Sequence, residues 1–422
     1  MSNSTANTTE SGDDSGDQPK LRPWDAFRFR DYRFLWLAAF MSTVVMWMRI
    51  LGTTQWLQNE TGTAAALGVV GIVQLFVQIP ALLWGGALSD KVDRKVLIGA
   101  ANAVSFTVFL ILGALDTAGA LRLWIVYLAI AMTAGAQMIV NPARSALMPS
   151  TVPRTHIMLG VTTDTASQSV AMIVGPLIFA FVASAFGLTT VFFVGAAIAL
   201  PAMFAPMLIR AAGRAEGGSD GSTITRIREG FTFVARHPIL PGLFLLDTGN
   251  TVVSFYREIL PALALGLFAA GAQGTGLLGA ANSTGAVLGA VSVLFFLNYR
   301  AKGMLVLYAT LVYAIALFGF GTVNTLWMGM VMIAILGGAD AVTVAVRQTT
   351  IQLTTPDHMR GRAFSFMILA AQTANNIGTI WVGFWAAAIG PGNTMVMGGV
   401  IAVVATLIVW RVWRPIREYR YP

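Results

Sequence analysis

Cysteine is absent from the 422 residues, and histidine and charged side chains are scarce. Without cysteine the chain forms no disulfide and no thiolate metal site. Its three histidines, His156, His237 and His358, lie in short polar segments, so we expect no histidine metal cluster and no histidine proton relay in the apolar segments. Charged residues make up 11% of the chain, against about 25% in an ordinary soluble domain. This composition excludes an ordinary soluble protein.

Motifs of nucleotide and hydrolytic chemistry are also missing. The chain has no G-x-x-x-x-G-K-[ST] phosphate-binding loop, so we expect no ATP hydrolysis by that route. It shows no histidine-rich cluster, no nucleophile triad and no large soluble segment. We predict that the protein is not an enzyme and needs neither a cofactor nor a metal ion.

Apolar residues are abundant instead, at 56% of the chain. They fall into runs of about 20 residues, the length at which a helix crosses the hydrocarbon core of a bilayer. The sequence predicts twelve transmembrane helices, near residues 34–57, 62–88, 96–115, 120–142, 157–186, 187–209, 241–266, 271–298, 304–323, 325–352, 364–390 and 392–413.

The polar segments divide the chain into two halves. Residues 1–33 form an acidic, disordered cytoplasmic tail with an entry segment, 34–209 a six-helix half, 210–240 a cytoplasmic linker, 241–413 a second six-helix half, and 414–422 a cytoplasmic tail. We therefore predict an all-α integral membrane protein, with two six-helix halves related by pseudo-symmetry.

Positive charge is distributed unevenly among the loops. All 27 Lys and Arg residues except Arg49, Arg122 and Arg257 lie in segments that would be cytoplasmic if the N-terminus is inside. The positive-inside rule then places both termini in the cytoplasm, and we expect a multi-pass protein of the inner membrane of a prokaryote. The net charge of +8 is explained by topology and contact with anionic lipid, and we expect no nucleic-acid partner.

An internal repeat links the two halves. The stretch that begins at Thr43 and ends at Arg49 resembles the stretch from Thr251 to Arg257, at an offset of 208 residues, and Arg144 and Arg347 each stand nine residues before a proline. Six spans separate the copies, so both halves enter the membrane from the same side. This parallel repeat is typical of transporters with a central substrate site between the halves.

A charged motif separates the second and third spans. The segment from Gly86 through Asp90 to Arg94 and Lys95 resembles the G-x-L-x-D-[RK]-x-G-[RK]-[RK] signature of the major facilitator superfamily, with Asp93 in place of the second glycine. The resemblance implies that Gly86, Asp90, Arg94 and Lys95 form a conformational latch. A solvated turn with positive-inside charges is the alternative.

A closer resemblance covers most of residues 24–413. The stretches 231–238, 260–263 and 355–362 are similar to the branch that contains enterobactin exporters and macrolide-type efflux pumps. This implies alternating-access export of an amphipathic, siderophore-like or drug-like small molecule in exchange for protons. A lipid or lysolipid flippase of the same fold is an alternative, and a membrane receptor or enzyme a more remote one. We expect a monomer whose partners are the substrate, protons and membrane lipid.

Polar residues recur inside the apolar spans, where a charge is tolerated mainly beside a cavity or a partner. Asp247, Thr251, Ser254 and Glu258 would form one stripe on a continuous seventh span, at about 100° per residue. Similar residues on other spans predict a water-accessible cavity lined by spans 1, 4, 5, 7, 10 and 11.

Roles are assigned to these residues by depth and chemistry. Arg49 and Arg257 should lie at similar depth on opposite walls as an outer gate or an anion site, and the full set of predicted substrate or gate residues is Arg49, Gln137, Asn250, Arg257, Glu258, Gln372 and Asn376. An apolar environment disfavours an ionised carboxylate, which makes Asp164, Asp247, Glu258 and Asp340 the candidates for proton coupling. Arg144 and Arg347, near helix ends, are predicted to be structural, through contacts with helix termini or acidic neighbours. For Arg49 and Arg257 the alternative is static ion pairing or snorkelling toward the outer headgroups. For Asp164, Asp247 and Asp340 the alternative is hydrogen bonding to a neighbouring helix.

Overall fold

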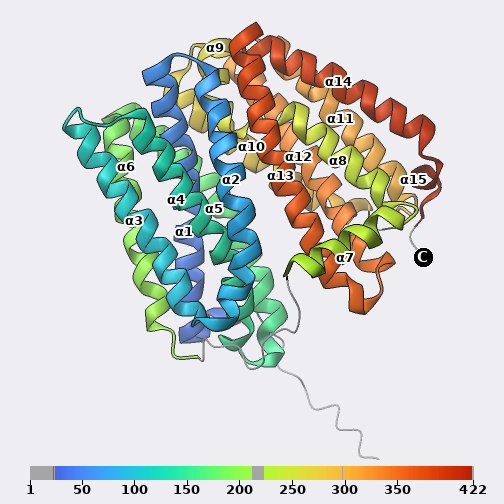
Figure 1. Ribbon diagram of the computed structural model, residues 1–422, viewed down its shortest axis with the longest axis horizontal. Helices are drawn as coiled ribbons and strands as arrows, with labels where there is room; N and C mark the ends of the chain where they lie inside the picture. The colour runs from blue at the N-terminus through green and yellow to red at the C-terminus, as the bar shows by residue number, and fades with distance from the viewer. Residues whose placement is uncertain (1–21, 23, 212–222, 297, 421–422) are drawn as a thin grey trace, which may run out of the picture.

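The computed structural model describes residues 22, 24–211, 223–296 and 298–420, and for residues 85–91, 223–224, 226 and 358 it describes the backbone alone. Every regular element in these residues is a helix (Figure 1). Eleven described helices are long and apolar enough to cross a membrane. A further long helix, α13, carries the polar residues Gln372, Asn375 and Asn376.

The N-terminal half contains six long helices. After a short 3-10 helix (Asp25–Arg28) they are α1 (Arg30–Thr61), α2 (Ala64–Lys91), α3 (Arg94–Thr117), α4 (Leu123–Leu147), α5 (Ile157–Phe186) and α6 (Leu188–Phe204), with short 3-10 helices at Met148–Ser150, Arg154–His156 and Ala205–Leu208. They agree with the first six predicted spans. Several ends differ by a few residues.

The C-terminal half begins after an additional helix, α7 (Thr223–Arg236), in the predicted linker. Its spans are α8 (Leu240–Ser254) with η5 (Arg257–Ile259) and α9 (Leu260–Phe268), then α10 (Gly271–Ser292) with a 3-10 extension (Val293–Phe296), α11 (Lys302–Thr322), α12 (Leu326–Thr354), α13 (Asp357–Ile389) and α14 (Pro391–Val412), and the short α15 (Arg414–Glu418) follows.

The seventh span is not the continuous helix that the polar stripe required. Helix α8 ends at Ser254, Phe255 is extended with φ −73° and ψ 95°, and Pro261 stands in the first turn of α9. Proline has no N–H, so it cannot donate to the carbonyl four residues earlier, that of Arg257. The predicted stripe is therefore wrong beyond Ser254, and Glu258 lies on a separate element.

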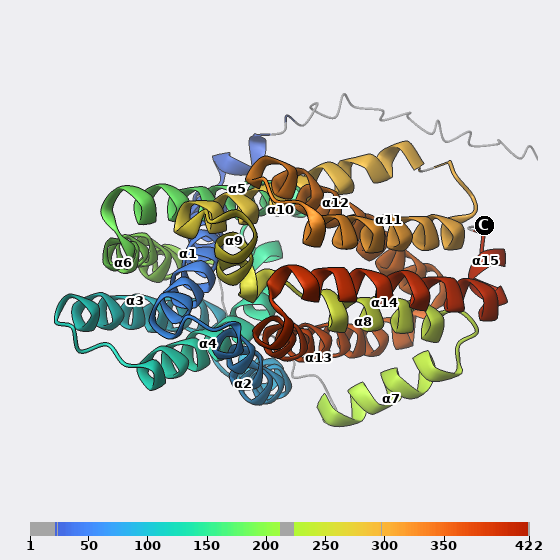
Figure 2. The ribbon, with the colours of Figure 1, turned by 90° about the horizontal axis from the view of Figure 1, so that it is seen from above.

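The two halves meet at one end of the molecule and diverge toward the other, where α7 lies (Figure 1). Contacts across the boundary join α2 with α13, α5 with α10, and α1 with α9. They are close because small residues face each other: an added Cβ on Gly383 would lie 2.4 Å from the Cα of Gly68, and one on Gly276 would lie 2.6 Å from the carbonyl oxygen of Pro176. Figure 2 shows the two helical groups side by side, with α7 at the edge.

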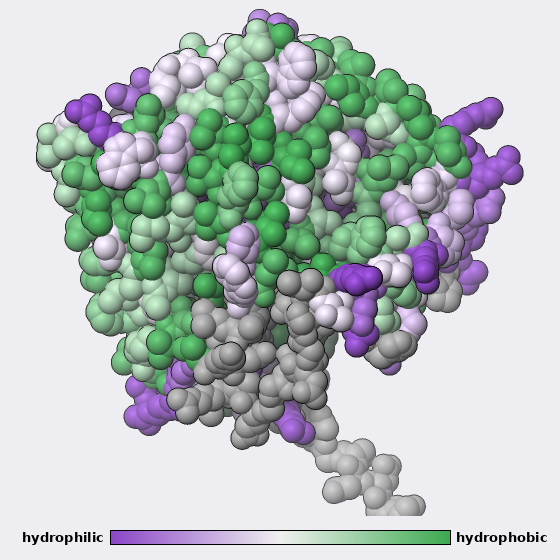
Figure 3. Space-filling model, in the orientation of Figure 1, coloured by the Kyte–Doolittle hydropathy of each residue, from purple (hydrophilic) through white to green (hydrophobic). Residues whose placement is uncertain are grey.

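The visible surface carries a broad hydrophobic band over the membrane-spanning helices, with hydrophilic residues toward its margins (Figure 3). Exposed large side chains such as Phe76, Trp84, Phe181 and Leu288 belong to these helices. Such a surface is expected where lipid, not water, surrounds the protein.

Candidate functional site

A cavity of about 240 Å³ lies between the halves, lined mainly by the C-terminal half. Its polar lining includes Ser254, Arg257, Asn282, Tyr313, Asp340, Arg347 and Asn375, and the N-terminal half adds Trp47 and Met172. The cavity thus receives residues from α1, α5, α8, α10, α11, α12 and α13. The fourth span, α4, was predicted to line the cavity, but none of its described residues does so. Helices α10 and α11 line the cavity although the sequence did not predict this.

Two arginines line this cavity, and Arg257 is the one that stands beside aromatic rings. Its guanidinium carbon lies 5.5 Å from the ring centre of Trp47 and 5.2 Å from that of Phe255, distances at which a cation is attracted to an aromatic face. Asp340 also lines the cavity and is attracted electrostatically by Arg257, although no direct ion pair joins them in the described chain. The site therefore offers a cation, a carboxylate and two aromatic faces.

Hydrogen bonds hold the walls around these charges. The hydroxyl of Tyr256 donates to Oδ1 of Asn282 at 2.7 Å, and the hydroxyls of Ser254 and Tyr313 lie 2.9 Å apart. These contacts fix α8, α10 and α11 relative to one another. Asn250 is buried beside them in a small polar recess with Asp247 and Thr343. Sequence analysis did not single out Tyr313 and Asn282, because neither side chain carries a charge.

Arg347 lies in the same cavity and forms an ion pair with Asp247. Both side chains are almost completely removed from solvent. The expected acidic neighbour is present, and α12 continues for two further turns beyond Arg347 to Thr354. Arg347 therefore joins α12 to α8 in the wall of the cavity.

Arg49 lies elsewhere, in the contact that closes one end of the cavity. Its side chain is 6% exposed and that of Glu258 is 4% exposed, and Glu258 attracts its guanidinium electrostatically. Nε2 of Gln74 donates to Oε1 of Glu258 at 3.3 Å. Arg49 and Gln74 belong to one half and Glu258 to the other. The prediction that Arg49 and Arg257 face each other across one cavity is wrong, because the repeat is broken at η5.

A second polar contact closes the same boundary. Oε1 of Gln78 accepts hydrogen bonds from Nε2 of Gln372 at 2.7 Å and from Nδ2 of Asn376 at 3.0 Å. Gln372 and Asn376, predicted to meet substrate, thus join α13 to α2 in this conformation. Sequence analysis missed Gln78, although its spacing of four from Gln74 placed both amides on one face of the second span.

Comparison with known proteins assigns this architecture to a family. The model of the transmembrane secretion effector family matches residues 21–419. The chain belongs to this family. Among its relatives are enterobactin exporters named EntS, from Citrobacter koseri, at 23% identity over 93% of this chain and 94% of that protein, and from Escherichia coli, at 24% identity over 92% and 93%.

Solved structures with the same fold are transporters as well. The nucleoside transporter NupG aligns with a TM-score of 0.74 at 12% identity over 91% of this chain and 99% of that chain. A bacterial homologue of the human lysosomal transporter Spinster, described as inward-facing and unoccupied, aligns with a TM-score of 0.67 at 14% identity over 93% and 99%. The predicted major facilitator fold of twelve helices is confirmed. The protein is an integral inner-membrane transporter and not an enzyme.

The structure describes only part of the motif that runs from Gly86 to Lys95. Gly86 and Asp90 lie among the residues with backbone alone. Arg94 donates to the carbonyl of Ala146 at 3.1 Å, and Lys95 donates to the carbonyls of Ile209 and Ala211. These contacts stay within the N-terminal half, so the latch remains a prediction. Asp93, the departure from the motif, caps α3 by accepting from the backbone N–H of Lys95 at 2.9 Å.

The remaining predicted residues lie on the N-terminal half. Asp164 is half-buried on α5 and is attracted by Arg144, three residues before the end of α4. Gln137 is half-buried on α4. None of the three is among the residues that line the central cavity in the described chain. Among the described residues, every charged side chain that lines the cavity therefore belongs to the C-terminal half.

Proposed function

We propose that the protein exports an anionic, amphipathic small molecule with aromatic groups, of the siderophore kind, by alternating access in exchange for protons. The observation that carries this proposal is Arg257, held between the rings of Trp47 and Phe255 in the cavity between the halves. A guanidinium binds carboxylates and other oxyanions, and the rings offer stacking surfaces. The enterobactin exporters among the relatives carry a name that agrees with such cargo.

The direction of opening follows from the distribution of contacts. The halves contact each other through Gly68, Gly276, Gln78 and Glu258, whereas they diverge toward α7, which adds a smaller contact with α2 (Figure 1). Positive charge places the termini and α7 in the cytoplasm. In this proposal the conformation is therefore closed to the outside, with the cavity facing the cytoplasm from which cargo is taken.

Among the four candidate acids, Asp340 fits the role of proton carrier best. Asp247 is held in an ion pair with Arg347. Glu258 is buried in the contact between the halves that includes Arg49 and Gln74. Asp164 is not among the described residues that line the cavity. Asp340 faces the cavity and has no direct ion-pair partner in the described chain. It could exchange a proton with water while its attraction to Arg257 changes with cargo binding.

The proposal is tested in proteoliposomes with an imposed pH gradient. We expect uphill transport of enterobactin by the wild type and about tenfold weaker binding by Arg257→Ala, since a charge-assisted hydrogen bond contributes about 1.5–3 kcal/mol. Arg122→Ala, which removes an exposed arginine outside the cavity, should match the wild type. Asp340→Asn should still bind enterobactin but lose uphill transport.

Other outcomes would overturn the proposal. Unchanged enterobactin binding by Arg257→Ala would refute the anion site. Uphill export by Asp340→Asn would place proton coupling at another residue. Movement of a fluorescent lysolipid, with no transport of enterobactin, would favour the flippase alternative.

A further inference from the structure

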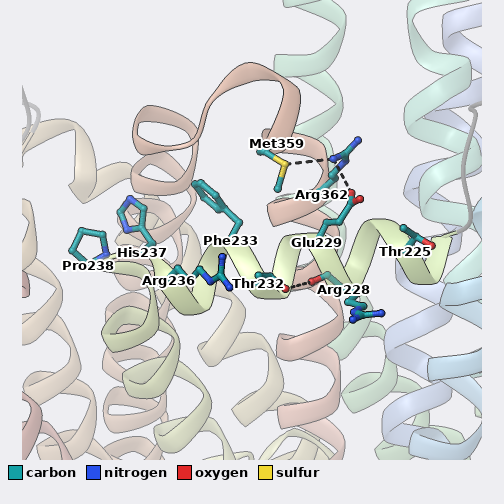
Figure 4. A pocket seen from close by; sticks show the side chains of 10 residues that line it. All are labelled: Thr225, Arg228, Glu229, Thr232, Phe233, Arg236, His237, Pro238, Met359 and Arg362. Carbon is teal, nitrogen blue, oxygen red and sulfur yellow. Dashed lines mark hydrogen bonds and ion pairs between the residues drawn. The ribbon is translucent and has the colours of Figure 1, made fainter.

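An open pocket of about 720 Å³ lies outside the transport pathway, between α7 and the beginning of α13 (Figure 4). It shares no lining residue with the central cavity. Helix α7 supplies most of its lining, and Met359 and Arg362 of α13 supply the opposite side (Figure 4). The transport cycle as proposed gives this pocket no role.

Positive charge predominates in the pocket. Arg362 forms an ion pair with Glu229 at 2.7 Å, and Glu229 is the only acid among the described residues that line the pocket. Arg228 and Arg236 are exposed, and neither guanidinium has an ion-pair partner within the described residues. Two arginines therefore remain available to an anion.

His237 adds a neutral donor beside them. Its Nδ1 accepts from the backbone N–H groups of Ile239 at 3.2 Å and Leu240 at 3.3 Å, at the start of α8. Burial lowers the pKa of His237 below its usual value of 6.5, so the ring is neutral at pH 7. With Nδ1 accepting, the proton of the neutral ring is on Nε2, and this N–H can donate to a bound oxyanion.

The remainder of the pocket is apolar and lies at the edge of the fold. Phe233, Pro238 and Met359 contribute to its lining. On the same helix Phe231 is 54% exposed and packs on Phe366 with ring centres 5.4 Å apart. Figure 2 shows α7 at the periphery of the helical bundle, and Figure 1 shows it at the end where the halves diverge. An amphipathic helix in this position is suited to the boundary between headgroups and acyl chains.

Helix α7 is also firmly attached to the transport domain. An added Cβ on Gly230 would lie 2.2 Å from the carbonyl oxygen of Arg362, so only glycine allows this approach. Val234, one turn further along, is buried in the core that α13 shares with α8. A ligand in the pocket therefore touches a surface fixed to α13 and not a freely moving linker.

We propose that this pocket binds an anionic phospholipid headgroup, with its phosphate beside Arg236 and His237 and attracted by Arg228, two turns earlier on α7. Arginine forms paired, charge-assisted hydrogen bonds with phosphate oxygens, and the apolar lining accommodates the beginning of an acyl chain. A soluble phosphate offers the same anionic chemistry without the chain. The apolar lining and the peripheral position favour the lipid.

The test uses the full-length protein in detergent micelles, with phosphatidylglycerol and phosphatidylcholine as probes and native mass spectrometry as the readout. The wild type should bind phosphatidylglycerol in preference to phosphatidylcholine. The double variant Arg228→Gln/Arg236→Gln should bind phosphatidylglycerol about 30-fold more weakly, since each arginine near anionic lipid contributes about fivefold. Arg228→Lys/Arg236→Lys should retain most of the preference, because the charge is kept.

A matched control separates the pocket from general positive charge. Arg154→Gln/Arg414→Gln removes two exposed arginines outside the pocket and should bind phosphatidylglycerol like the wild type. If phosphatidylglycerol binding weakened equally in the control and pocket variants, or weakened in neither, the proposed binding site would be wrong. If glycerol 1-phosphate displaced phosphatidylglycerol at equal concentration, the ligand would be a soluble phosphate and the lipid assignment would be wrong.

Discussion

The ion pair between Asp247 and Arg347 connects α8 and α12 inside the membrane-spanning part of the fold. When one partner of a buried pair is removed, the other charge remains without compensation, which destabilises a protein by about 3–5 kcal/mol. We expect Asp247→Asn to lower the thermal unfolding midpoint in detergent by several degrees. The double variant Asp247→Asn/Arg347→Gln should recover much of this loss.

Scanning fluorimetry on the purified variants measures both midpoints. Glu418→Gln, an exposed carboxylate near the C-terminus, is the control and should unfold like the wild type. A double variant as unstable as Asp247→Asn alone would show that the pair does not act as a unit.

Sequence reasoning located most of these charged residues but not their partners. Asp247, Asp340 and Arg257 stood out because ionisable groups are rare in apolar spans. Which acid meets which arginine depends on the rotation of each helix about its own axis, and a polar stripe fixes that rotation only roughly. Arg347 pairs with Asp247, whereas Arg257 faces Asp340 without a direct pair, and no spacing in the sequence distinguishes these outcomes.

At the scale of elements, α10 packs against α12 through glycine. An added Cβ on Gly285 would lie 1.9 Å from the carbonyl oxygen of Ala334, whereas one on Gly249 in α8 would meet no atom within 4 Å. We expect Gly285→Ala to separate the two helices and destabilise the fold by about 1–3 kcal/mol. Gly249→Ala should be neutral or slightly stabilising, since alanine favours a helix over glycine by up to about 1 kcal/mol.

The two alanine variants differ by one methyl group each, so their unfolding midpoints are directly comparable. A loss of stability in Gly249→Ala equal to that in Gly285→Ala would argue against close backbone approach as the reason for glycine on α10.

The twelve spans were predictable because their apolar runs match the thickness of a bilayer. Two elements were not predictable from the sequence: the break in the seventh span and helix α7. The break at Phe255 and Tyr256 lies inside a predicted span, where Pro261 alone signals it and proline is tolerated in many membrane helices. Helix α7 lies in a segment whose polar composition indicated a linker, and its fold depends on packing of Val234 and Gly230 against α13.

At the scale of the whole molecule, Glu258 is buried where the halves meet, accepts a hydrogen bond from Gln74 and attracts Arg49 electrostatically. Glu258→Gln removes their attraction and leaves Arg49 without a compensating acid in that contact. We expect this variant to open the end that is closed here, with a larger fraction of molecules in the outward-open state. Transport should slow because the outward-closed state is then harder to reach.

The chain is suited to this measurement because it has no native cysteine. Spin labels at Glu60→Cys and Gln273→Cys, both exposed near that end, report the separation of the halves by pulsed electron resonance. The distance distribution should shift to longer values in Glu258→Gln and remain unchanged in Glu418→Gln. An identical distribution in all three proteins would contradict a gating role for the pair.

The cavity is lined unequally by the two repeats. Trp47 and Met172 are its contributions from the N-terminal half, whereas the C-terminal half supplies every charged residue among the described lining. A molecule held by these charges would remain attached to the C-terminal half while the other half tilts around it. In the proposed cycle the C-terminal half would therefore supply most of the recognition, with the ring of Trp47 added by the N-terminal half. On this proposal a cargo of different charge would require substitutions at the cavity charges alone, and the contacts that join the halves would stay as they are.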